Sequence, residues 1–572
     1  MSAHSQRSQR HVTLVGRVTR ARRRRQFSAV PAVWVTAVAF FVLVPLAAVV
    51  TRSFQHREDG FGLGNYAEVL SRPQIWEALL NSLILGVGSA VGSLAIAVPY
   101  AYLVSRTDLP MRRFFRSTAV LTFAAPGFVA AMGWILLLGP QSGLINAHVL
   151  APLGIPRFNI FSLPGILLCL ILFLYPLIFL PLVEALDTMD SRLEEAAESL
   201  GASRFKVFTT VTLPLTTPAL FSGTLLVFIS AFTIFGPVAL LGSPVGIDSV
   251  PTAMFGLMSS PPRIEYAAVL GLPVVLVLAL LLWFQHRIKS RRRFTTVSGK
   301  PGKARRVALG RLRWPMWCAG MAIFFLSILL PFGVLVLTSF RRAVGEPLSW
   351  DNLVLFDNYR ALLEQDTILA SFVNSIWIAL AASIGAMVLA YLAVWLKTRA
   401  GWRGASVVQP VMLAPLAFPG AILGIAMLIA YSGGPLWLGG TLTIMVVAYM
   451  IRVIPQSFSY IDAGVEQINS ETEEAARNLG AGWLQTVRRV SIPLIRGPLL
   501  AVGLLNFVIL FRELDISIFL YTGNNGVAPV ILYNLAAESQ FQVMGALAVV
   551  ILAVNLGVVI TATRLLRIKI AG

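Results

Sequence analysis

The segment Leu193–Ser203 (LEEAAESLGAS) returns later in the chain as Thr472–Gly482 (TEEAARNLGAG). Both copies are rich in glutamate and alanine, which favour an α-helix, and both carry a glycine where a left-handed residue would end that helix, Gly201 and Gly480. The spacings Ser191–Glu194 and Ser470–Glu473 predict a capping box at each helix start. The sequence therefore predicts the same short polar helix twice.

Shorter repeats extend this duplication toward the N-terminal side of each copy. Three dipeptides recur at an offset of 293 residues: Asn65-Tyr66 as Asn358-Tyr359, Asn81-Ser82 as Asn374-Ser375, and Pro126-Gly127 as Pro419-Gly420. The polar helix itself recurs at an offset of 279 residues, so the second copy lacks 14 residues, which we assign to the loop at 140–162. The chain is thus predicted to be two parallel repeats of one unit.

Composition places both repeats in a membrane. Of the 572 residues, 57% are hydrophobic and only 13% are charged, about half the charged fraction of soluble domains. The apolar segments have the length of membrane helices rather than of barrel strands. We expect an all-α membrane protein of about twelve helices, six per repeat. The expected helices are 30–51, 78–105, 117–139, 163–187, 214–242 and 265–287, then 315–339, 371–396, 405–431, 437–459, 494–521 and 542–566.

The net charge of +20 comes from basic residues gathered beside the apolar segments. Such clusters mark the cytoplasmic membrane surface, so both termini are predicted to be cytoplasmic, and we expect no nucleic-acid partner. The predicted organisation is a basic tail (1–29), a first half (30–287), a basic cytoplasmic linker (288–314) and a second half (315–572). The five histidines and two cysteines form no ligand pattern, so no metal site is expected.

The two polar helices resemble the E-A-A-x-x-x-G motif of permease subunits of binding-protein-dependent ABC importers. The residues that carry the resemblance, with their flanking glutamates, are Glu194, Glu195, Ala196, Ala197, Gly201, Leu213 and Pro214, and Glu473, Glu474, Ala475, Ala476, Gly480, Ile492 and Pro493. The resemblance implies the type I importer permease fold in a bacterial inner membrane. It also implies that these residues couple the permease to a cytoplasmic ATPase dimer, and that a solute-binding protein delivers the cargo from outside. The chain would then be no enzyme and bind no cofactor, with ATP held by the partner ATPase.

The fused layout, the basic linker and the text around Phe511–Asp515 look most like fused permeases assigned to ferric iron. Relatives assigned to thiamine, aminoethylphosphonate or polyamines remain alternatives. A secondary transporter or a channel is a further alternative, because such proteins can also have six plus six helices. The duplicated polar helix argues against both, since neither has a use for it.

Three ionisable residues lie inside an apolar segment of the second half, namely Arg512, Glu513 and Asp515. Charged groups within a membrane are costly and usually face an interior. In a continuous helix Arg512 and Asp515 could form an ion pair, whereas Glu513 would face elsewhere. The triplet is therefore predicted either to line the transport pathway or to form a structural ion pair.

Overall fold

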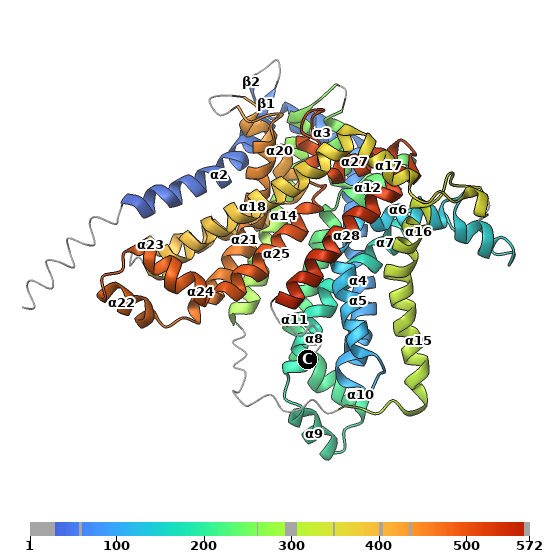
Figure 1. The fold of residues 1–572 in the computed structure, drawn as a ribbon, viewed down its shortest axis with the longest axis horizontal. Coiled ribbons are helices and arrows are strands. Elements are labelled where there is room, and N and C mark those ends of the chain that lie inside the picture. Colours follow the sequence, from blue (N-terminus) through green and yellow to red (C-terminus); the bar gives the residue numbers. More distant parts are fainter. Residues whose placement is uncertain are drawn as a thin grey trace, which may run out of the picture.

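The computed structural model describes residues 29–565 except 57–59, 260, 292–305, 347–348, 400–403 and 434–436. Most of the predicted linker and nearly all of the predicted tail lie outside the described residues. Within the described part, the fold is helical apart from a two-stranded hairpin and two isolated bridges (Figure 1). The prediction of an all-α architecture is confirmed.

In its described part, the first repeat contains fifteen helices and strands, apart from its short π- and 3-10-helical turns. They are α2 (Ala29–Phe54), β1 (Gln55–His56), β2 (Gly60–Phe61), α3 (Gly64–Leu70), α4 (Pro73–Arg106), α5 (Arg112–Ala124), α6 (Gly127–Leu138), α7 (Leu163–Leu174), α8 (Pro176–Thr188), α9 (Arg192–Ser199), α10 (Arg204–Val207), α11 (Leu213–Thr233), α12 (Gly236–Leu241), α13 (Val250–Leu257), and, closing the repeat, α14 (Ile264–Arg291).

The second repeat follows the same order after the linker. Its elements are α15 (Arg313–Phe324), α16 (Leu330–Ser339), α17 (Asp357–Glu364), α18 (Asp366–Thr398), α19 (Ala405–Leu413), α20 (Gly420–Tyr431), α21 (Leu442–Glu466), α22 (Ser470–Asn478), α23 (Trp483–Thr486), α24 (Ile492–Leu494), α25 (Arg496–Phe511), α26 (Ser517–Leu520), α27 (Ala528–Ala537) and α28 (Phe541–Leu565).

The predicted number of membrane crossings agrees with the structure once bent helices are considered. Among the described residues, nine helices are long and apolar enough to cross a membrane, and four bent helix pairs bring the maximum to 13. The bent pair of α12 and α13 consists of helices of only 6 and 8 residues, far shorter than the roughly 20 residues that a crossing requires. We therefore interpret α12–α13 as a re-entrant hairpin, which leaves twelve spans.

Several predicted helices are broken, and this corrects the sequence-based expectation of straight spans. The expected helix 117–139 bends by 99° between α5 and α6, and its counterpart 405–431 bends by 106°. Each bend occurs at a Pro-Gly pair, Pro126-Gly127 and Pro419-Gly420, because proline cannot continue the preceding hydrogen-bond ladder. The hairpins α12–α13 and α26–α27 were not predicted as separate elements.

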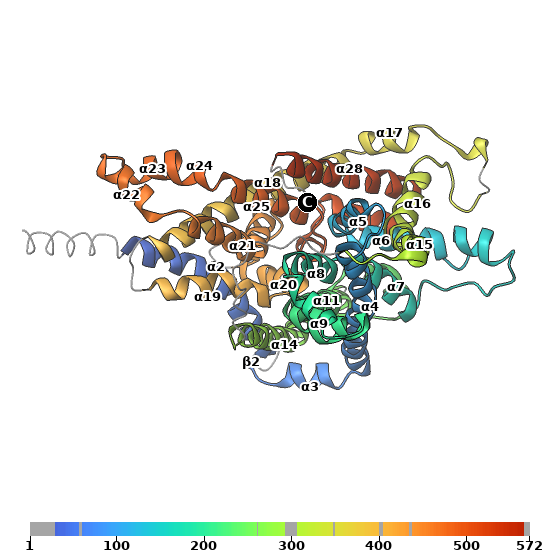
Figure 2. The same cartoon turned by 90° about the horizontal axis from the view of Figure 1, so that it is seen from below.

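One helix of each half packs against the other half at their interface. Helix α2 of the first half packs against α20 of the second, and α16 of the second half packs against α6 of the first. The reciprocal contacts fit two parallel repeats related by a pseudo-two-fold axis. Figure 1 shows α9 and α22 at well-separated places, α9 at the bottom and α22 at the left of the molecule, each at the tip of its own half, and they are also apart in Figure 2.

Candidate coupling sites and the central charged cluster

The first predicted polar helix is α9, which projects beyond the membrane helices (Figure 1). It ends before Gly201, whose φ of +85° is the left-handed conformation predicted for that glycine. A new turn begins at Ser203, whose hydroxyl accepts a hydrogen bond from the backbone N–H of Lys206 (3.4 Å). A π-helical turn (Phe208–Thr212) then leads into α11, which starts at the predicted Leu213 and Pro214.

The second copy repeats this geometry. Helix α22 ends before Gly480, whose φ is +91°, so the predicted left-handed helix end is confirmed in both halves. The chain continues through α23 and a π-helical turn (Val487–Ser491) to α24, which contains Ile492 and Pro493. We call the two regions 190–214 and 469–494 the coupling segments.

The predicted capping boxes are wrong in both coupling segments. Ser191 is the N-cap of α9, but its side chain makes no capping hydrogen bond. In the second half the N-cap is Asn469, whose side chain accepts from the N–H of Glu471 (3.2 Å). The glutamates Glu194 and Glu473 have other partners, because charged groups outside their own helices come within reach.

Glu194 connects three elements of the first half. Its carboxylate accepts a 2.6 Å hydrogen bond from the hydroxyl of Thr212 and lies 3.7 Å from the guanidinium of Arg106, the last residue of α4. The Arg106 side chain is only 1% exposed, so this charge is held inside the protein. The glutamate therefore joins the polar helix to the end of α4 and to the start of α11.

Glu473 makes the equivalent contacts in the second half. Its carboxylate lies 3.1 Å from Nε of Arg399, which follows α18, and accepts a 2.8 Å hydrogen bond from the hydroxyl of Ser491. Arg399 also donates to the carbonyl of Ile468 (3.1 Å). Two independent copies of the same three-way contact indicate that it is built into the repeat.

The outer faces of the coupling segments expose large apolar side chains. Leu200 and Leu479, which precede the two left-handed glycines, are each 89% exposed, and Phe205 and Leu484 are 77% and 68% exposed. Ala196 and Ala475 are exposed beside them, Ala197 and Ala476 are half-buried, and Glu474 is exposed while Glu195 is half-buried. Apolar side chains presented on short polar helices indicate a protein-binding surface.

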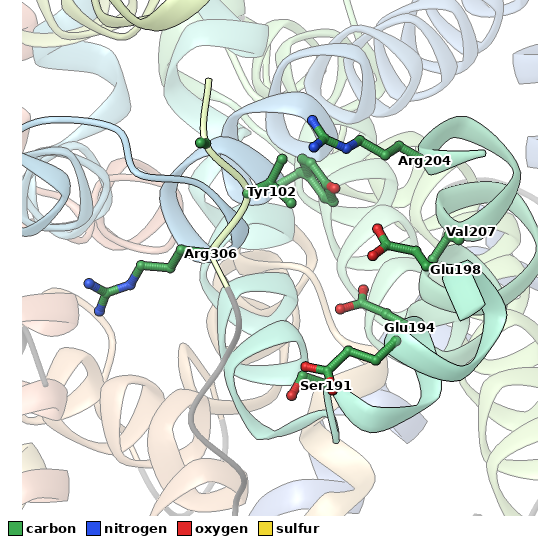
Figure 3. A pocket seen from close by; sticks show the side chains of 10 residues that line it. Tyr102, Ser191, Glu194, Glu198, Arg204, Val207 and Arg306 are labelled. Atoms are coloured by element: carbon green, nitrogen blue, oxygen red, sulfur yellow. The ribbon is translucent and has the colours of Figure 1, made fainter. Parts of the chain in front are cut away.

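A cavity of about 220 Å³ separates the first coupling segment from the described end of the linker. Glu194, Glu198 and Tyr102 line it from one side, and Arg306 lies on the linker (Figure 3). The linker is fixed there, because the N–H of Val307 donates to the carbonyl of Arg106 (2.8 Å). The sequence did not reveal this docking of the linker.

The charged triplet lies where the two halves meet. Helix α25 ends at Phe511, so Arg512, Glu513 and Asp515 lie in a non-helical turn before α26. The ion pair that a continuous helix would allow between Arg512 and Asp515 is not formed between these two described residues. The break in the helix removes the spacing on which that pair depended.

Arg512 instead binds the first half. Its guanidinium donates to the carbonyls of Phe123 (2.6 Å) and Ala125, at the end of α5, and its Cζ lies 5.4 Å from the centre of the Phe123 ring. Asp515 faces the backbone N–H groups of Phe235 and Gly236 at the start of α12. Both side chains therefore contact helix ends of the opposite half.

Glu513 stays within its own half. Its carboxylate accepts from the N–H of Ile516 (3.2 Å) and lies beside Gly420, at the start of α20. Its backbone carbonyl accepts from the hydroxyl of Tyr449 (3.1 Å) on α21. The triplet thus joins broken helices of both halves, and we call Arg512, Glu513 and Asp515 the central cluster.

Sequence reasoning missed Arg106 and Arg399, although a signal was present. Each is the basic residue at the end of the long helix that contains the Asn-Ser repeat, and the two are related by the same offset of 293 residues. The re-entrant hairpins were missed because their helices are too short to be separated from the preceding spans by hydropathy.

A twelve-span protein with two pseudo-symmetric halves, each carrying a projecting polar helix, is the permease subunit of an ABC importer. The chain belongs to the family of binding-protein-dependent transport system inner membrane components, whose model matches residues 26–294 and 382–567. It is a multi-pass inner-membrane protein. A permease of this class is not itself an enzyme, and the family in general works with a separate ATPase and a binding protein.

Known relatives agree with this membership. The chain is similar to the ferric transport system permease protein FbpB of Actinobacillus pleuropneumoniae, with 25% identity over 91% of this chain and 76% of that protein. It is 26% identical to the probable ABC transporter permease protein y4fN of Sinorhizobium fredii, over 92% of this chain and 94% of that protein. It is also 29% identical to the spermidine/putrescine permease PotB of Haemophilus influenzae, over 43% of this chain and 88% of that protein.

Proposed function

We propose that this permease imports ferric iron. The observation that carries the proposal is the similarity to FbpB, which extends over 91% of the chain and therefore over both fused halves. The similarity to PotB covers 43% of the chain, so a polyamine is the second candidate and rests on less of the molecule. Thiamine and aminoethylphosphonate remain alternatives from the resemblance alone.

We further propose that each coupling segment binds one subunit of a cytoplasmic ATPase dimer. The exposed Leu200 and Phe205, and Leu479 and Leu484, supply apolar contact area at two equivalent places, as two identical ATPase subunits would require. ATP is bound by that partner. A solute-binding protein delivers the cargo on the opposite face, and the chain itself holds no cofactor.

The orientation follows from the same proposal. If the coupling segments meet a cytoplasmic ATPase, the linker and both termini are cytoplasmic, and the loop at 140–162 is external. The positive charge of the linker and of the segments beside the spans supports this orientation.

The cargo would pass between the halves, beside the central cluster. Arg512 and Asp515 reach from the second half to helix ends of the first, so separation of the halves would expose them to the passing solute. A group of at least three His, Cys, Asp or Glu side chains that could hold a metal is not found among the described residues.

Reconstitution in liposomes with the cognate ATPase and binding protein tests the proposal. We expect ATP-dependent accumulation of radioactive ferric iron, and none when the ATPase cannot hydrolyse ATP. Accumulation of spermidine but not iron would replace the proposed cargo. Uptake that needs an ion gradient and no ATP would refute coupling to an ATPase altogether.

A further inference from the structure

The repeated Asn-Ser dipeptide has a specific position at one end of α4. The side-chain amide of Asn81 donates to the carbonyl of Asp248 (3.0 Å), and the hydroxyl of Ser82 accepts from the N–H of Val250 (2.8 Å), the first residue of α13. Ser82 is fully buried. The start of α4 is therefore bound to the re-entrant hairpin α12–α13.

Helix α18 makes the same contacts in the second half. Asn374 donates to the carbonyl of Gly526 (3.0 Å), and Ser375 accepts from the N–H of Ala528 (2.8 Å), the first residue of α27. The hairpin α26–α27 is thus bound to the start of α18. Because both repeats keep both hydrogen bonds, the attachment belongs to the ancestral unit and not to one half.

The opposite ends of the same two helices are bound to the coupling segments. Arg106 ends α4 and lies against Glu194 of α9, and Arg399 follows α18 and lies against Glu473 of α22. Helices α4 and α18 have 34 and 33 residues, which corresponds to a length of about 50 Å; α18 contains no proline, whereas α4 contains Pro99 near its Arg106 end. Each half therefore has one continuous helix with a coupling segment at one end and a re-entrant hairpin at the other.

We propose that α4 and α18 are connecting rods that transmit ATPase-driven movement of the coupling segments to the re-entrant hairpins. This rests on the proposed coupling to an ATPase and assigns new roles to Arg106, Arg399 and the two Asn-Ser pairs. They act as positioning residues, because they hold the rods to the parts that move. A continuous helix transmits displacement along its axis, whereas the bent spans next to it can change shape at their breaks.

The rods also reach the central cluster. Helix α12, held by α4 through its hairpin, begins at Gly236, where Asp515 faces its backbone N–H groups. Helix α26, held by α18, begins directly after the central cluster. Movement of either rod would therefore change the contacts between the central cluster and the hairpins, which is where the proposed route of the cargo lies.

The test measures hairpin movement and transport separately. Spin labels at Val245 and Asn524, which are exposed and lie in the turns before α13 and α27, report the distance between the two hairpins. The complete transporter is compared without nucleotide and with ATP trapped in a hydrolysis-deficient ATPase. In the parent protein we expect ATP to shift this distance and to drive import; failure of ATP to drive import would instead refute the proposed function.

In Asn374→Leu we expect the ATPase to bind and hydrolyse ATP as in the parent, while import per ATP falls about tenfold and the label distance shift shrinks. Tenfold is the change expected from losing one buried hydrogen bond. Ser371→Ala is the matched control, because the Ser371 hydroxyl bonds only to its own helix, at the carbonyl of Ile368 (2.7 Å). It should leave both readouts unchanged.

Glu473→Gln tests the other end of the same rod and serves if Asn374→Leu lowers the folded yield. It keeps an acceptor for Ser491 but loses the charge that binds Arg399. Thr398→Val is its control, because the Thr398 hydroxyl bonds within α18 to Val394 (2.8 Å). An ATP-driven label shift of parental size in both Asn374→Leu and Glu473→Gln would overturn the connecting-rod proposal while leaving ATP coupling intact.

Discussion

Replacement of Gly480 by valine isolates the effect of backbone conformation in a coupling segment. Gly480 has a φ of +91°, and a Cβ placed on it meets nothing within 4 Å. The Cβ of a substituted residue therefore meets no neighbouring group, and the main cost of a valine is the left-handed backbone. That conformation costs a non-glycine residue about 1–3 kcal/mol, with β-branched residues at the upper end.

The cost acts on the docking geometry and not on the membrane fold. A strain of about 2 kcal/mol corresponds to a change of about 30-fold in the population of the native turn. We therefore expect Gly480→Val to be inserted and folded as the parent, to bind the ATPase about 30-fold more weakly, and to import correspondingly less at limiting ATPase. Titration of the ATPase against the permease in lipid nanodiscs measures this affinity, and uptake into liposomes measures the consequence.

Gly482 supplies the matched control two residues away. It also has open space around an added Cβ, but its φ is −67°, which any residue adopts. Gly482→Val should bind the ATPase within about fivefold of the parent, since its cost is only the roughly 1 kcal/mol by which valine is disfavoured at the N-cap of α23. Parental binding by Gly480→Val, or equal loss in both variants, would refute the argument from backbone conformation.

Three further predictions concern other parts of the molecule. Arg512→Leu removes two charge-assisted hydrogen bonds between the halves and should lower the melting temperature of the purified permease. Adding Asp515→Leu should not restore that temperature, because the two residues contact different helix ends; restoration would show that they pair. In a thiol-free variant, an impermeant reagent added outside sealed cells should label a cysteine at Ser142 and not one at Ala308, and equal labelling would refute the proposed orientation. A hydrogen bond from Tyr266 holds the pKa of the Glu68 carboxyl below its ordinary value. Glu68→Gln should therefore lower the melting temperature at neutral pH and have little effect once the pH falls below the folded-state pKa of Glu68. A destabilisation that grows toward acid pH would contradict this pH dependence.

The sequence was sufficient for the features that depend on local pattern. Apolar length predicted the spans, and the two glycines in equivalent positions predicted the left-handed ends of α9 and α22, which the structure confirms. The number of spans followed because each apolar segment has roughly the 20 residues that a helix needs to cross the hydrocarbon core. Domain boundaries and the roles of the coupling residues remain predictions.

What the sequence could not provide depends on contacts between distant segments. The capping boxes failed because Arg106 and Arg399, far from the glutamates in sequence, compete for the same carboxylates. The ion pair in the central cluster failed because the helix ends at Phe511, and no local propensity distinguishes that ending from a continuous span. Hydropathy records burial but does not record where a buried helix is interrupted.

The two halves are equivalent at their ends and different at their centre. The Asn-Ser attachment and the glutamate–arginine contact occur in both halves. The charged residues do not: the repeat aligns Asp515 with Gly236 and Arg512 with Thr233. The first half therefore presents backbone N–H and carbonyl groups at the interface, and the second half presents the charges that bind them. An asymmetric contact of this kind requires two halves that differ in sequence, because identical halves would place the same three side chains on both sides of the axis. Fusion into one chain keeps the two different halves together in every transporter. It thereby permits an asymmetric central cluster between two equivalent coupling segments.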